Sequence, residues 1–346
     1  MTDMDFSTVY GPQAYDSTHI PDQPPQVRRH TGALSQRLPW GYTQEILPIG
    51  FIGGFDPKSL REEDERERQE PGYRARLAET LNAVFDHQRY RYTPLQGWTQ
   101  LFIYMHGLGK WSFIVILATF IIGFPVVAFA LRDSSLYDVF ITVLELGFWV
   151  LTPCLVSWLI GYLVLKYVPE RYLLKPSRKG PVWEMNRQTG LVTIFARKPG
   201  QFRKLGIEGD FVAPFYEFDA AIHTIPDRQG FPLHMLNLVH RYQVAAIDFS
   251  VLMGKVGIQT HCMALWDFWQ QYMDISKPLP EVPDLEPFRH LDPTTAEHDQ
   301  RTGRPARYWR DMDEQTYKRR IQEISDISKV NMDRLNIMVR HVRYMH

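Results

Sequence analysis

Two long apolar runs, separated by only a few residues, constrain this chain more than any other feature. Residues 111–131, beginning at Trp111, carry no charge and match the ~20 residues needed to cross a ~30 Å hydrocarbon layer. Residues 139–165 are longer, and the insertion cost of their single ionisable residue, Glu145, is outweighed by the many Leu, Ile, Val and Phe residues around it. Both runs are predicted to span a membrane as helices.

The two spans should form an antiparallel hairpin, because only residues 132–138 separate them. Arg132 is the one basic residue in this loop, whereas basic residues crowd the outer ends of both runs. These are Arg89, Arg91, Lys110, Lys166, Arg171, Lys175, Arg178 and Lys179. Since positive residues favour the cytoplasmic side, both termini are predicted to be cytoplasmic. Residues after Met1 do not have the pattern of a cleaved signal peptide.

Four residues of the hairpin are predicted as membrane residues: Trp111, Pro125, Glu145 and Pro153. Glu145 could bind a proton or ion, but a helix beginning near Leu146 would leave it at the outer interface, and the sequence favours this alternative. Pro125 and Pro153 would each free a backbone carbonyl and kink a helix, as in transporters. Two helices leave no room for a central substrate cavity, so a transporter acting alone is not expected.

The chain before the hairpin divides into two predicted segments. Residues 1–58 are rich in Pro and Gly and should form an extended cytoplasmic arm. This arm either crosses the protein's own surface, which is favoured, or offers a polyproline ligand to a partner domain. Residues 59–110 are predicted to contain cytoplasmic helices, one solvated over 59–70 and one amphipathic over 73–87.

The fold class expected after the hairpin, which spans residues 111–165, is an antiparallel β domain over residues 180–275. Residues 182–195 read as a β-hairpin closed by a Gly-containing turn, and four further strand-like runs follow. An amphipathic helix over 263–274 should cap the sheet, which at the level of fold resembles a pleckstrin-homology-like half-barrel. The whole is thus an α+β membrane protein, completed by a proline-rich, loop-rich segment over 276–312 and a C-terminal helix over 313–346.

Composition and motifs argue against several classes of function. The 39 Lys and Arg residues balance 39 Asp and Glu, and no local basic face suits nucleic acid. His234 and His240 are too few for a metal site, and Cys154 and Cys262 are too far apart in sequence to suggest a zinc-ligand spacing or a disulfide framework. Cys262 follows His261 without an orienting Asn or Asp, so it is read as a packing residue. No enzyme activity, metal or cofactor is expected.

A partner-binding segment is predicted near the C-terminus, because Arg, Tyr and Trp dominate interface energetics. Its residues are Arg301, Arg304, Arg307, Tyr308, Trp309 and Arg310. Such a segment could hold an acidic protein partner or anionic lipid headgroups. The alternative is that Tyr308 and Trp309 pin the segment back onto the sheet.

Five short sequence phrases stand out between residues 186 and 309. They are Asn186 to Gly190, Pro278 to Pro280, Asp292 with Pro293, Gly303 with Arg304, and Tyr308 with Trp309. Together with the order of arm, hairpin and cytoplasmic domain, they resemble an uncharacterised proteobacterial family of two-span membrane proteins found beside type VI secretion effectors. The resemblance implies an effector-associated membrane protein, either an immunity factor or an accessory protein, and supplies no active-site residue.

The function expected is therefore an anchored interaction protein that binds a protein partner, such as a secreted effector, on the cytoplasmic side. Its other contacts would be membrane lipids, and a homo-oligomer through the transmembrane helices is left open. The alternative is a membrane-inserting toxin or channel subunit in which Glu145 faces a lumen. An enzyme acting on lipids ranks last, because no nucleophile or paired carboxylates support it.

Overall fold

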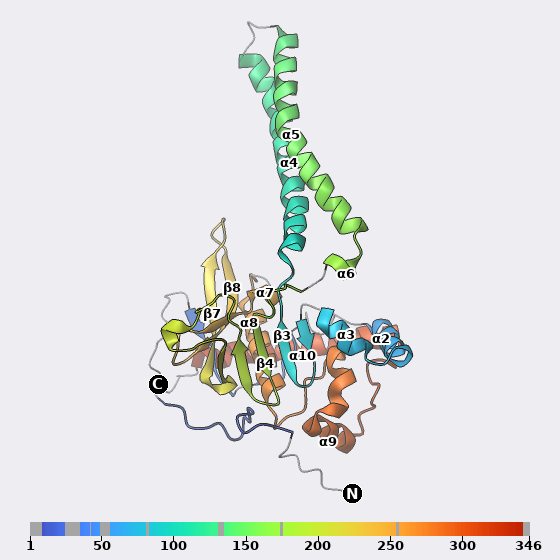
Figure 1. The fold of residues 1–346 in the computed structure, drawn as a ribbon, viewed down its shortest axis with the longest axis vertical. Coiled ribbons are helices and arrows are strands. Elements are labelled where there is room, and N and C mark those ends of the chain that lie inside the picture. Colours follow the sequence, from blue (N-terminus) through green and yellow to red (C-terminus); the bar gives the residue numbers. More distant parts are fainter. Residues whose placement is uncertain are drawn as a thin grey trace. The chain divides into compact units, whose positions relative to one another are not determined.

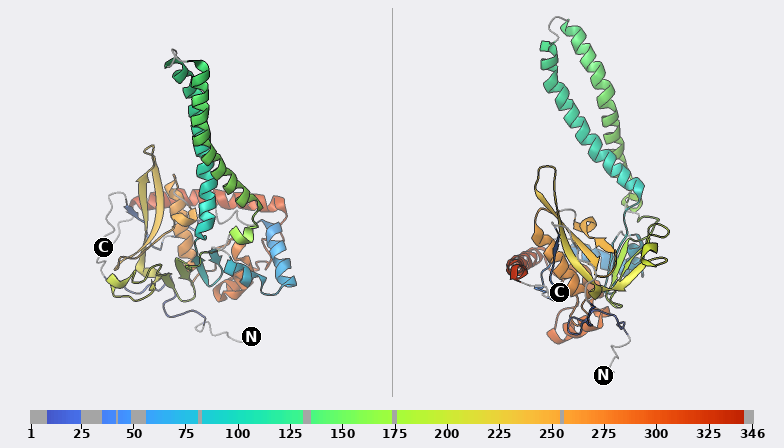
Figure 2. Two further views of the ribbon diagram at one scale, coloured as in Figure 1. Left: turned by 45° about the horizontal axis from the view of Figure 1, so that its top comes forward. Right: turned by 90° about the vertical axis from the view of Figure 1, so that its left-hand side faces the viewer.

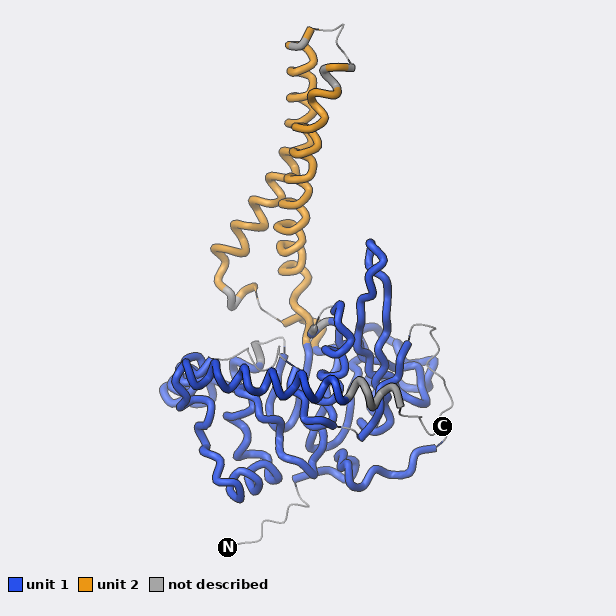
Figure 3. The backbone as a smooth tube through the Cα atoms, turned by 180° about the vertical axis from the view of Figure 1, so that it is seen from behind, with its two compact units in different colours: residues 1–79, 83–92, 181–346 blue, residues 80–82, 93–180 orange. Residues whose placement is uncertain are grey.

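The computed structural model describes residues 9–24, 35–41, 43–48, 56–80, 83–130, 135–173, 176–253 and 256–341. They fall into two compact units (Figure 3). The globular unit lies within residues 1–79, 83–92 and 181–346, and the hairpin unit within 80–82 and 93–180. The chain thus leaves the globular unit, forms the hairpin unit and returns.

The hairpin unit contains two long antiparallel helices, α4 (Gly97–Ala130) and α5 (Leu136–Tyr167), followed by the short α6 (Glu170–Leu173) (Figure 2). With 34 and 32 residues, α4 and α5 are long and apolar enough to cross a membrane. Both exceed the predicted spans. The expected helix start near Leu146 is wrong, because no Pro or Gly interrupts residues 136–145 and the helix begins at Leu136.

Glycines allow α4 and α5 to come close together. A Cβ atom on Gly109 would lie 2.6 Å from the backbone nitrogen of Trp158, and one on Gly161 would lie 2.5 Å from that of His106. Nearby, the Ser157 hydroxyl donates a 3.3 Å hydrogen bond to the Met105 carbonyl. Small residues at such a crossing permit backbone contact between helices.

The globular unit contains two antiparallel sheets (Figure 1). The five-stranded sheet has the order β2 (Ala83–Phe85), β3 (Arg89–Tyr92), β4 (Trp183–Asn186), β5 (Leu191–Ile194) and β6 (Phe211–Pro214). The four-stranded sheet has the order β1 (Ser35–Arg37), β7 (Phe218–Pro226), β8 (Pro232–His240) and β9 (Ala246–Asp248). Strands β3 and β4 are neighbours, so the hairpin unit is inserted between two paired strands.

Alternation and helical periodicity explain the core. In β4 and β5 the side chains of Trp183, Met185 and Val192 are buried on one face, as the predicted strand pair requires. The predicted capping helix is α8 (Gln259–Met273), whose Trp269 lies 4.7 Å from Tyr90 of β3 and 5.8 Å from Phe249 after β9, measured between ring centroids. Helix α8 therefore joins both sheets through aromatic packing.

The predicted helix over 73–87 is wrong in its second half. Helix α3 (Tyr73–Thr80) ends early, and β2 and β3 follow as a tight hairpin. Asp86 sets this turn, because its carboxylate accepts hydrogen bonds from the backbone nitrogens of Gln88 (2.7 Å) and Arg89 (2.9 Å). The predicted β domain over 180–275 is accordingly too narrow, since β1, β2 and β3 precede the hairpin unit.

The segment over 276–312 is also more regular than predicted. It contains the 3₁₀ helix η4 (Pro283–Leu291) and helix α9 (Pro293–Thr302). Pro283 and Pro293 stand at first helical positions, where a missing N–H is harmless, and Asp292 caps α9 by accepting from the backbone nitrogen of Thr295 at 3.1 Å. Prolines here begin helices instead of preventing them.

The remaining elements of the globular unit are short or peripheral. They are α2 (Pro57–Gln69), η2 (Arg203–Leu205), η3 (Phe215–Glu217), α7 (Ser250–Met253) and the predicted C-terminal helix, α10 (Glu314–His341). The described parts of the N-terminal arm run across this unit and bury Tyr15, Leu38 and Ile46. Three residues named in the sequence analysis or belonging to its proline-rich arm lie outside the described residues: Pro25, Arg132 and Lys175.

Candidate functional site

The arginine-rich segment predicted to bind a partner lies between α9 and α10, where Trp309 anchors it. Trp309 is fully buried. Its indole Nε1 donates to Glu281 at 2.7 Å, its backbone nitrogen donates to Glu286, and its ring meets that of Tyr308 edge-on at 5.2 Å. This geometry matches the alternative in which the aromatic residues hold the segment against the rest of the protein.

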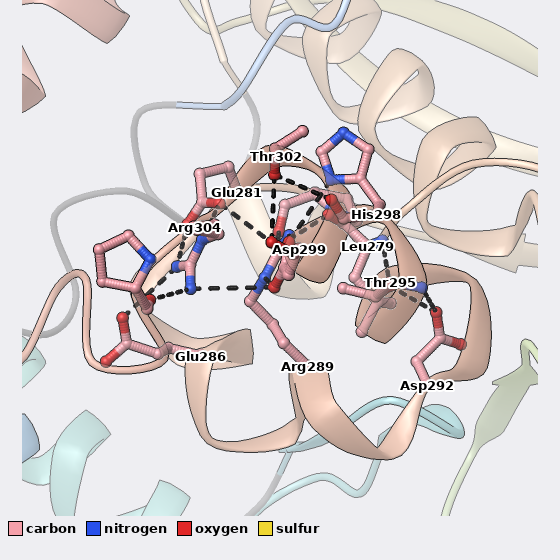
Figure 4. Close-up of polar contacts among 12 residues, drawn as sticks. Leu279, Glu281, Glu286, Arg289, Asp292, Thr295, His298, Asp299, Thr302 and Arg304 are labelled. Carbon is pink, nitrogen blue, oxygen red and sulfur yellow. Dashed lines mark hydrogen bonds and ion pairs between the residues drawn. The ribbon is translucent and has the colours of Figure 1, made fainter. Parts of the chain in front are cut away.

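Arg304 is held by carboxylates on three sides (Figure 4). Its guanidinium donates to both carboxylate oxygens of Glu281, at 2.6 and 2.7 Å, and to Glu286 at 3.4 Å. Only 10% of the side chain is exposed. A guanidinium paired with one carboxylate in this two-pronged manner is oriented within the protein and has few donors left for a partner.

Arg307 and Arg310 connect the segment to α2 through Asp64. Arg310 lies 3.0 Å from Asp64 and 2.9 Å from Glu286, and Arg307 donates to the other oxygen of Asp64. Burial alone would raise the pKa of Asp64, but the hydrogen bond from Arg307 and the charge of Arg310 hold the pKa below its ordinary value. Asp64 is therefore a charged anchor for the segment.

Arg289 makes a second two-pronged pair inside the same region (Figure 4). It donates two 2.7 Å hydrogen bonds to Asp299 on α9 and a third, of 3.1 Å, to the Leu279 carbonyl. Burial would raise the pKa of Asp299, yet the hydrogen bond and charge of Arg289 lower it overall. The Pro278 to Pro280 phrase is thereby tied to α9.

Arg187 is the one fully buried arginine among the described residues, and sequence reasoning did not single it out. Its guanidinium pairs with Asp292 at 3.0 Å and donates to the carbonyls of Tyr272 (2.6 Å) and Asp274 (2.7 Å). It therefore places positive charge at the C-terminal end of α8 and holds the residue that caps α9. The sequence feature that could have identified Arg187 is its position as the single charged residue in the predicted turn at residues 186–190.

The five phrases behind the family resemblance meet in this network, which we call the arginine–carboxylate network. Its arginines are Arg187, Arg289, Arg304, Arg307 and Arg310, and its acids are Asp64, Glu281, Glu286, Asp292 and Asp299. It fastens the turn of β4 and β5, the end of α8, η4, α9 and α2 to one another. These contacts join parts of the globular unit to one another.

Two members of the predicted segment remain accessible to a partner. Arg301, near the end of α9, is exposed and takes no ion pair among the described residues. Arg307 keeps 35% of its side chain exposed although it pairs with Asp64. Arg301 is therefore the residue of this segment that is most available for contact with a partner.

Histidine and cysteine side chains offer little reactive chemistry in the described part of the chain. Nε2 of His240 lies 2.9 Å from Glu217, and its Nδ1 accepts from the backbone nitrogens of Tyr242 and Gln243. Burial lowers the pKa of His240 despite Glu217, and both ring nitrogens are occupied. Burial raises the pKa of Cys262 to about 11, in line with a packing role. No group of three or more His, Cys, Asp or Glu residues among those described could hold a metal ion.

Asp267 on α8 holds the N-terminal arm in place. Its carboxylate accepts 2.8 Å hydrogen bonds from the backbone nitrogens of Gln44 and Ile46. The neighbouring Trp266 donates from Nε1 to the Pro39 carbonyl at 2.8 Å. Burial raises the pKa of Asp267 to about 6, against the effect of these hydrogen bonds. Asp267 and Trp266 thus bind the backbone of the arm, in the way that proteins bind extended peptides.

The four predicted membrane residues all lie in helices of the hairpin unit and are exposed. Trp111 and Pro125 belong to α4, and Glu145 and Pro153 to α5. Glu145 stands inside α5, well past its start at Leu136, and its position at the outer membrane interface stays a prediction. Comparison with known proteins finds no family model, no curated protein and no solved structure that matches this chain.

Proposed function

We propose that this chain is a membrane-anchored interaction protein whose globular unit binds a protein partner. The observation that carries the proposal is the apolar surface of α4 and α5, which is exposed along helices of 34 and 32 residues. Phe129 and Ile122, for example, are 75% and 74% exposed. A surface of this extent is stable in a lipid layer and would aggregate in water.

The two ends of the hairpin unit support a cytoplasmic position for both flanking segments. Leu95 and Pro176 form a bridge, and Ser177 donates from its backbone nitrogen to the Pro94 carbonyl at 2.7 Å. The chain therefore enters and leaves the hairpin unit at one place. Since the basic residues lie around these ends, we propose the cytoplasmic face of a bacterial inner membrane.

The partner is proposed to be a protein, and the family resemblance suggests a secreted effector or a component that acts with one. We also propose that the two sheets form a pleckstrin-homology-like domain. The chain would then act as an immunity protein or an accessory protein of the effector. Arg301 is the residue through which the predicted segment would contact the partner, because its charge is not neutralised by a described carboxylate.

Membrane anchoring is tested by extraction of the full chain from native membranes at alkaline pH. An integral hairpin stays in the membrane pellet after carbonate treatment and is released only by detergent. Release by carbonate would overturn the anchoring proposal, since a peripheral protein behaves in that way.

Partner binding is tested by affinity purification in mild detergent with Arg301→Glu. We expect this substitution to abolish capture of the partner while abundance and protease resistance stay normal. Arg228→Glu is the matched control, because Arg228 is exposed in the turn between β7 and β8. Equal capture by both variants would remove Arg301 from the interface.

One observation favours the second candidate, a channel subunit or membrane-inserting toxin. Glu145 is an exposed carboxylate within an apolar helix, and such groups often mark ion pathways. This function requires that expression of the chain depolarise the cell membrane and that Glu145→Gln prevent the depolarisation. An unchanged membrane potential would exclude it.

A further inference from the structure

Charge is distributed very unevenly along this chain. The whole sequence has as many basic as acidic residues, yet residues 166–204 contain ten Lys and Arg and only two acids, Glu170 and Glu184. Glu184 pairs with Arg91 at 2.6 Å, so it neutralises a residue that lies outside this stretch. The chain that follows α5 is therefore strongly basic, whereas the remainder is acidic overall.

Roles already described explain part of this basic excess. Basic residues within about 20 residues of a span end determine membrane orientation, and Arg187 is neutralised in the arginine–carboxylate network. Neither role covers residues 197–204, which we call the basic loop, because this loop begins 30 residues after α5 ends at Tyr167. Three of its cations are exposed and take no ion pair among the described residues: Lys198, Arg203 and Lys204.

The basic loop connects β5 to β6 and has a defined shape. Phe202 is buried beneath it, and the Gln201 side chain accepts a 2.9 Å hydrogen bond from the backbone nitrogen of Arg197. Gly200 has a positive φ of 70°, and the guanidinium group of Arg203 lies beside it, 3.5 Å from the position that a Cβ atom would take. The cations are thus displayed on an ordered turn, which lowers the entropic cost of binding a ligand.

The surroundings of the basic loop leave its charge available. Asp210, at the base of the loop, accepts a 2.8 Å hydrogen bond from the backbone nitrogen of Ala196, and neither it nor the exposed Glu208 forms an ion pair among the described residues. Arg197 donates from its guanidinium to the Pro181 carbonyl at 3.5 Å. Since Pro181 is the first residue of the globular unit after the hairpin unit, the basic loop is fastened where the chain returns from the long helices.

We propose that the basic loop binds the anionic lipid headgroups of the membrane in which the hairpin unit is anchored. The proposal rests on the membrane anchoring proposed above. Each Lys or Arg beside an anionic leaflet strengthens association roughly fivefold. Three such residues would hold a free protein weakly, but the anchor keeps the loop close to lipid and makes the association intramolecular. A nucleic acid would gain nothing from the anchor, and its phosphates would require a wider basic face. Lipid binding by the basic loop would restrain the globular unit at the membrane surface.

Hydrogen exchange of the full chain in lipid vesicles tests this proposal. The chain is reconstituted in vesicles of phosphatidylcholine alone and in vesicles of equal parts phosphatidylcholine and phosphatidylglycerol. The backbone nitrogens of Leu205 and Gly206 donate to carbonyls of Phe202 and Arg203, so their exchange reports on the shape of the loop. We expect exchange at least about threefold slower in the anionic vesicles, and we expect high salt to remove the difference.

A triple substitution tests whether the cations of the basic loop cause this difference. Exchange should become equal in the two kinds of vesicle with Lys198→Gln, Arg203→Gln and Lys204→Gln combined. The matched control removes the same charge from α10, at side chains that are 57–72% exposed, with Lys318→Gln, Arg319→Gln and Lys329→Gln. This control variant should keep the slower exchange in anionic vesicles. Loss of the difference in both variants would assign it to the overall charge and overturn the proposal.

Two further results separate the remaining alternatives. Slowing by inorganic phosphate in phosphatidylcholine vesicles, to the same extent as by phosphatidylglycerol, would identify a site for a soluble anion and contradict lipid binding. Equal exchange of the parent chain in both kinds of vesicle, while it still floats with them in a density gradient, would refute lipid binding alone. A chain that does not float with either kind of vesicle would instead show failure of the anchoring on which this proposal rests.

Discussion

Arg187 donates hydrogen bonds to several acceptors inside the globular unit. It is fully buried, and besides Asp292 and two carbonyls at the end of α8 it donates to the Lys277 carbonyl at 2.7 Å. Tyr10 from the N-terminal arm donates to the same Asp292 at 2.9 Å. Burial raises the pKa of Asp292, but the charge and hydrogen bond of Arg187 reverse this and lower it. The Arg187 side chain thus holds the end of α8 against the start of α9, and Asp292 links both to the N-terminal arm.

Arg187→Met is expected to destabilise the globular unit by about 3–5 kcal/mol, because removal of one partner leaves a buried carboxylate uncompensated. The measurement is denaturant unfolding in detergent, followed by tryptophan fluorescence. Arg203→Met is the control, since Arg203 is exposed in η2 and should cost less than ~0.5 kcal/mol. Equal stability of the two variants would show that the network contributes little.

Asp284 in η4 should make stability depend on pH. Its Oδ1 atom is buried without a hydrogen bond among the described residues, and burial, with the charge of Glu63, raises its pKa to about 7. The folded protein therefore holds a proton that the unfolded chain releases near pH 4. Unfolding free energy should rise as pH falls from about 8 to about 4, by on the order of 3–4 kcal/mol from this group.

Asp284→Asn should remove most of that dependence and raise the unfolding temperature at pH 8, because it abolishes the buried charge. Thermal melts at pH 5 and pH 8 measure both effects. Asp333→Asn, at an exposed position on α10, should leave the difference between the two melts unchanged. Identical pH dependence in parent and Asp284→Asn would assign the effect to other groups.

Elements whose partners lie nearby in sequence were the ones that could be predicted. The strand pair of β4 and β5 and helix α8 follow from a period of two and a helical period in continuous stretches. Strands β2 and β3 were missed because they are short and β3 pairs with β4 across the whole hairpin unit. Helix α9 was missed because Pro293 was read as a breaker, although it follows a capping Asp.

The partner segment shows the same limit at the level of a site. Composition identified Arg304, Trp309 and Arg310, but not the acids that bind them, since Asp64 lies in α2, far away in sequence. Residue type alone does not distinguish an arginine that binds a partner from one that holds the fold together. Burial and ion pairs place Arg304 and Arg310 within the fold, whereas Arg301 is exposed and takes no ion pair among the described residues.

The crossing of α4 and α5 depends on the absence of a side chain at Gly161. Gly161→Ala should push the helices apart, since its Cβ would meet the His106 backbone, and should lower hairpin stability by about 1–3 kcal/mol. Gly123→Ala is the matched control, because a Cβ there meets no atom within 4 Å. Resistance of membrane-embedded chain to trypsin, compared between the two variants, measures the effect.

At the scale of the whole molecule, the globular unit is built from chain on both sides of the hairpin unit. Reporters fused after Met1 and after His346 should therefore both behave as cytoplasmic, because the basic excess also lies on that side. A phosphatase reporter should be inactive and a fluorescent reporter bright at both ends. Opposite behaviour at the two ends would contradict this prediction, because the sheets are built from strands that come before and after the hairpin unit.

The insertion of the hairpin unit between β3 and β4 also dictates an order of synthesis. Strands β2 and β3 leave the ribosome first and remain without their neighbour until both long helices have been made, because β4 follows α5. Folding of the five-stranded sheet thus waits for synthesis of both long helices, and an exposed strand edge must be protected meanwhile. In the folded protein, the hydrogen bonds between β3 and β4 join the chain before the hairpin unit to the chain after it. A protease cut in the loop between α4 and α5 should therefore yield two fragments that stay together until the sheet is unfolded.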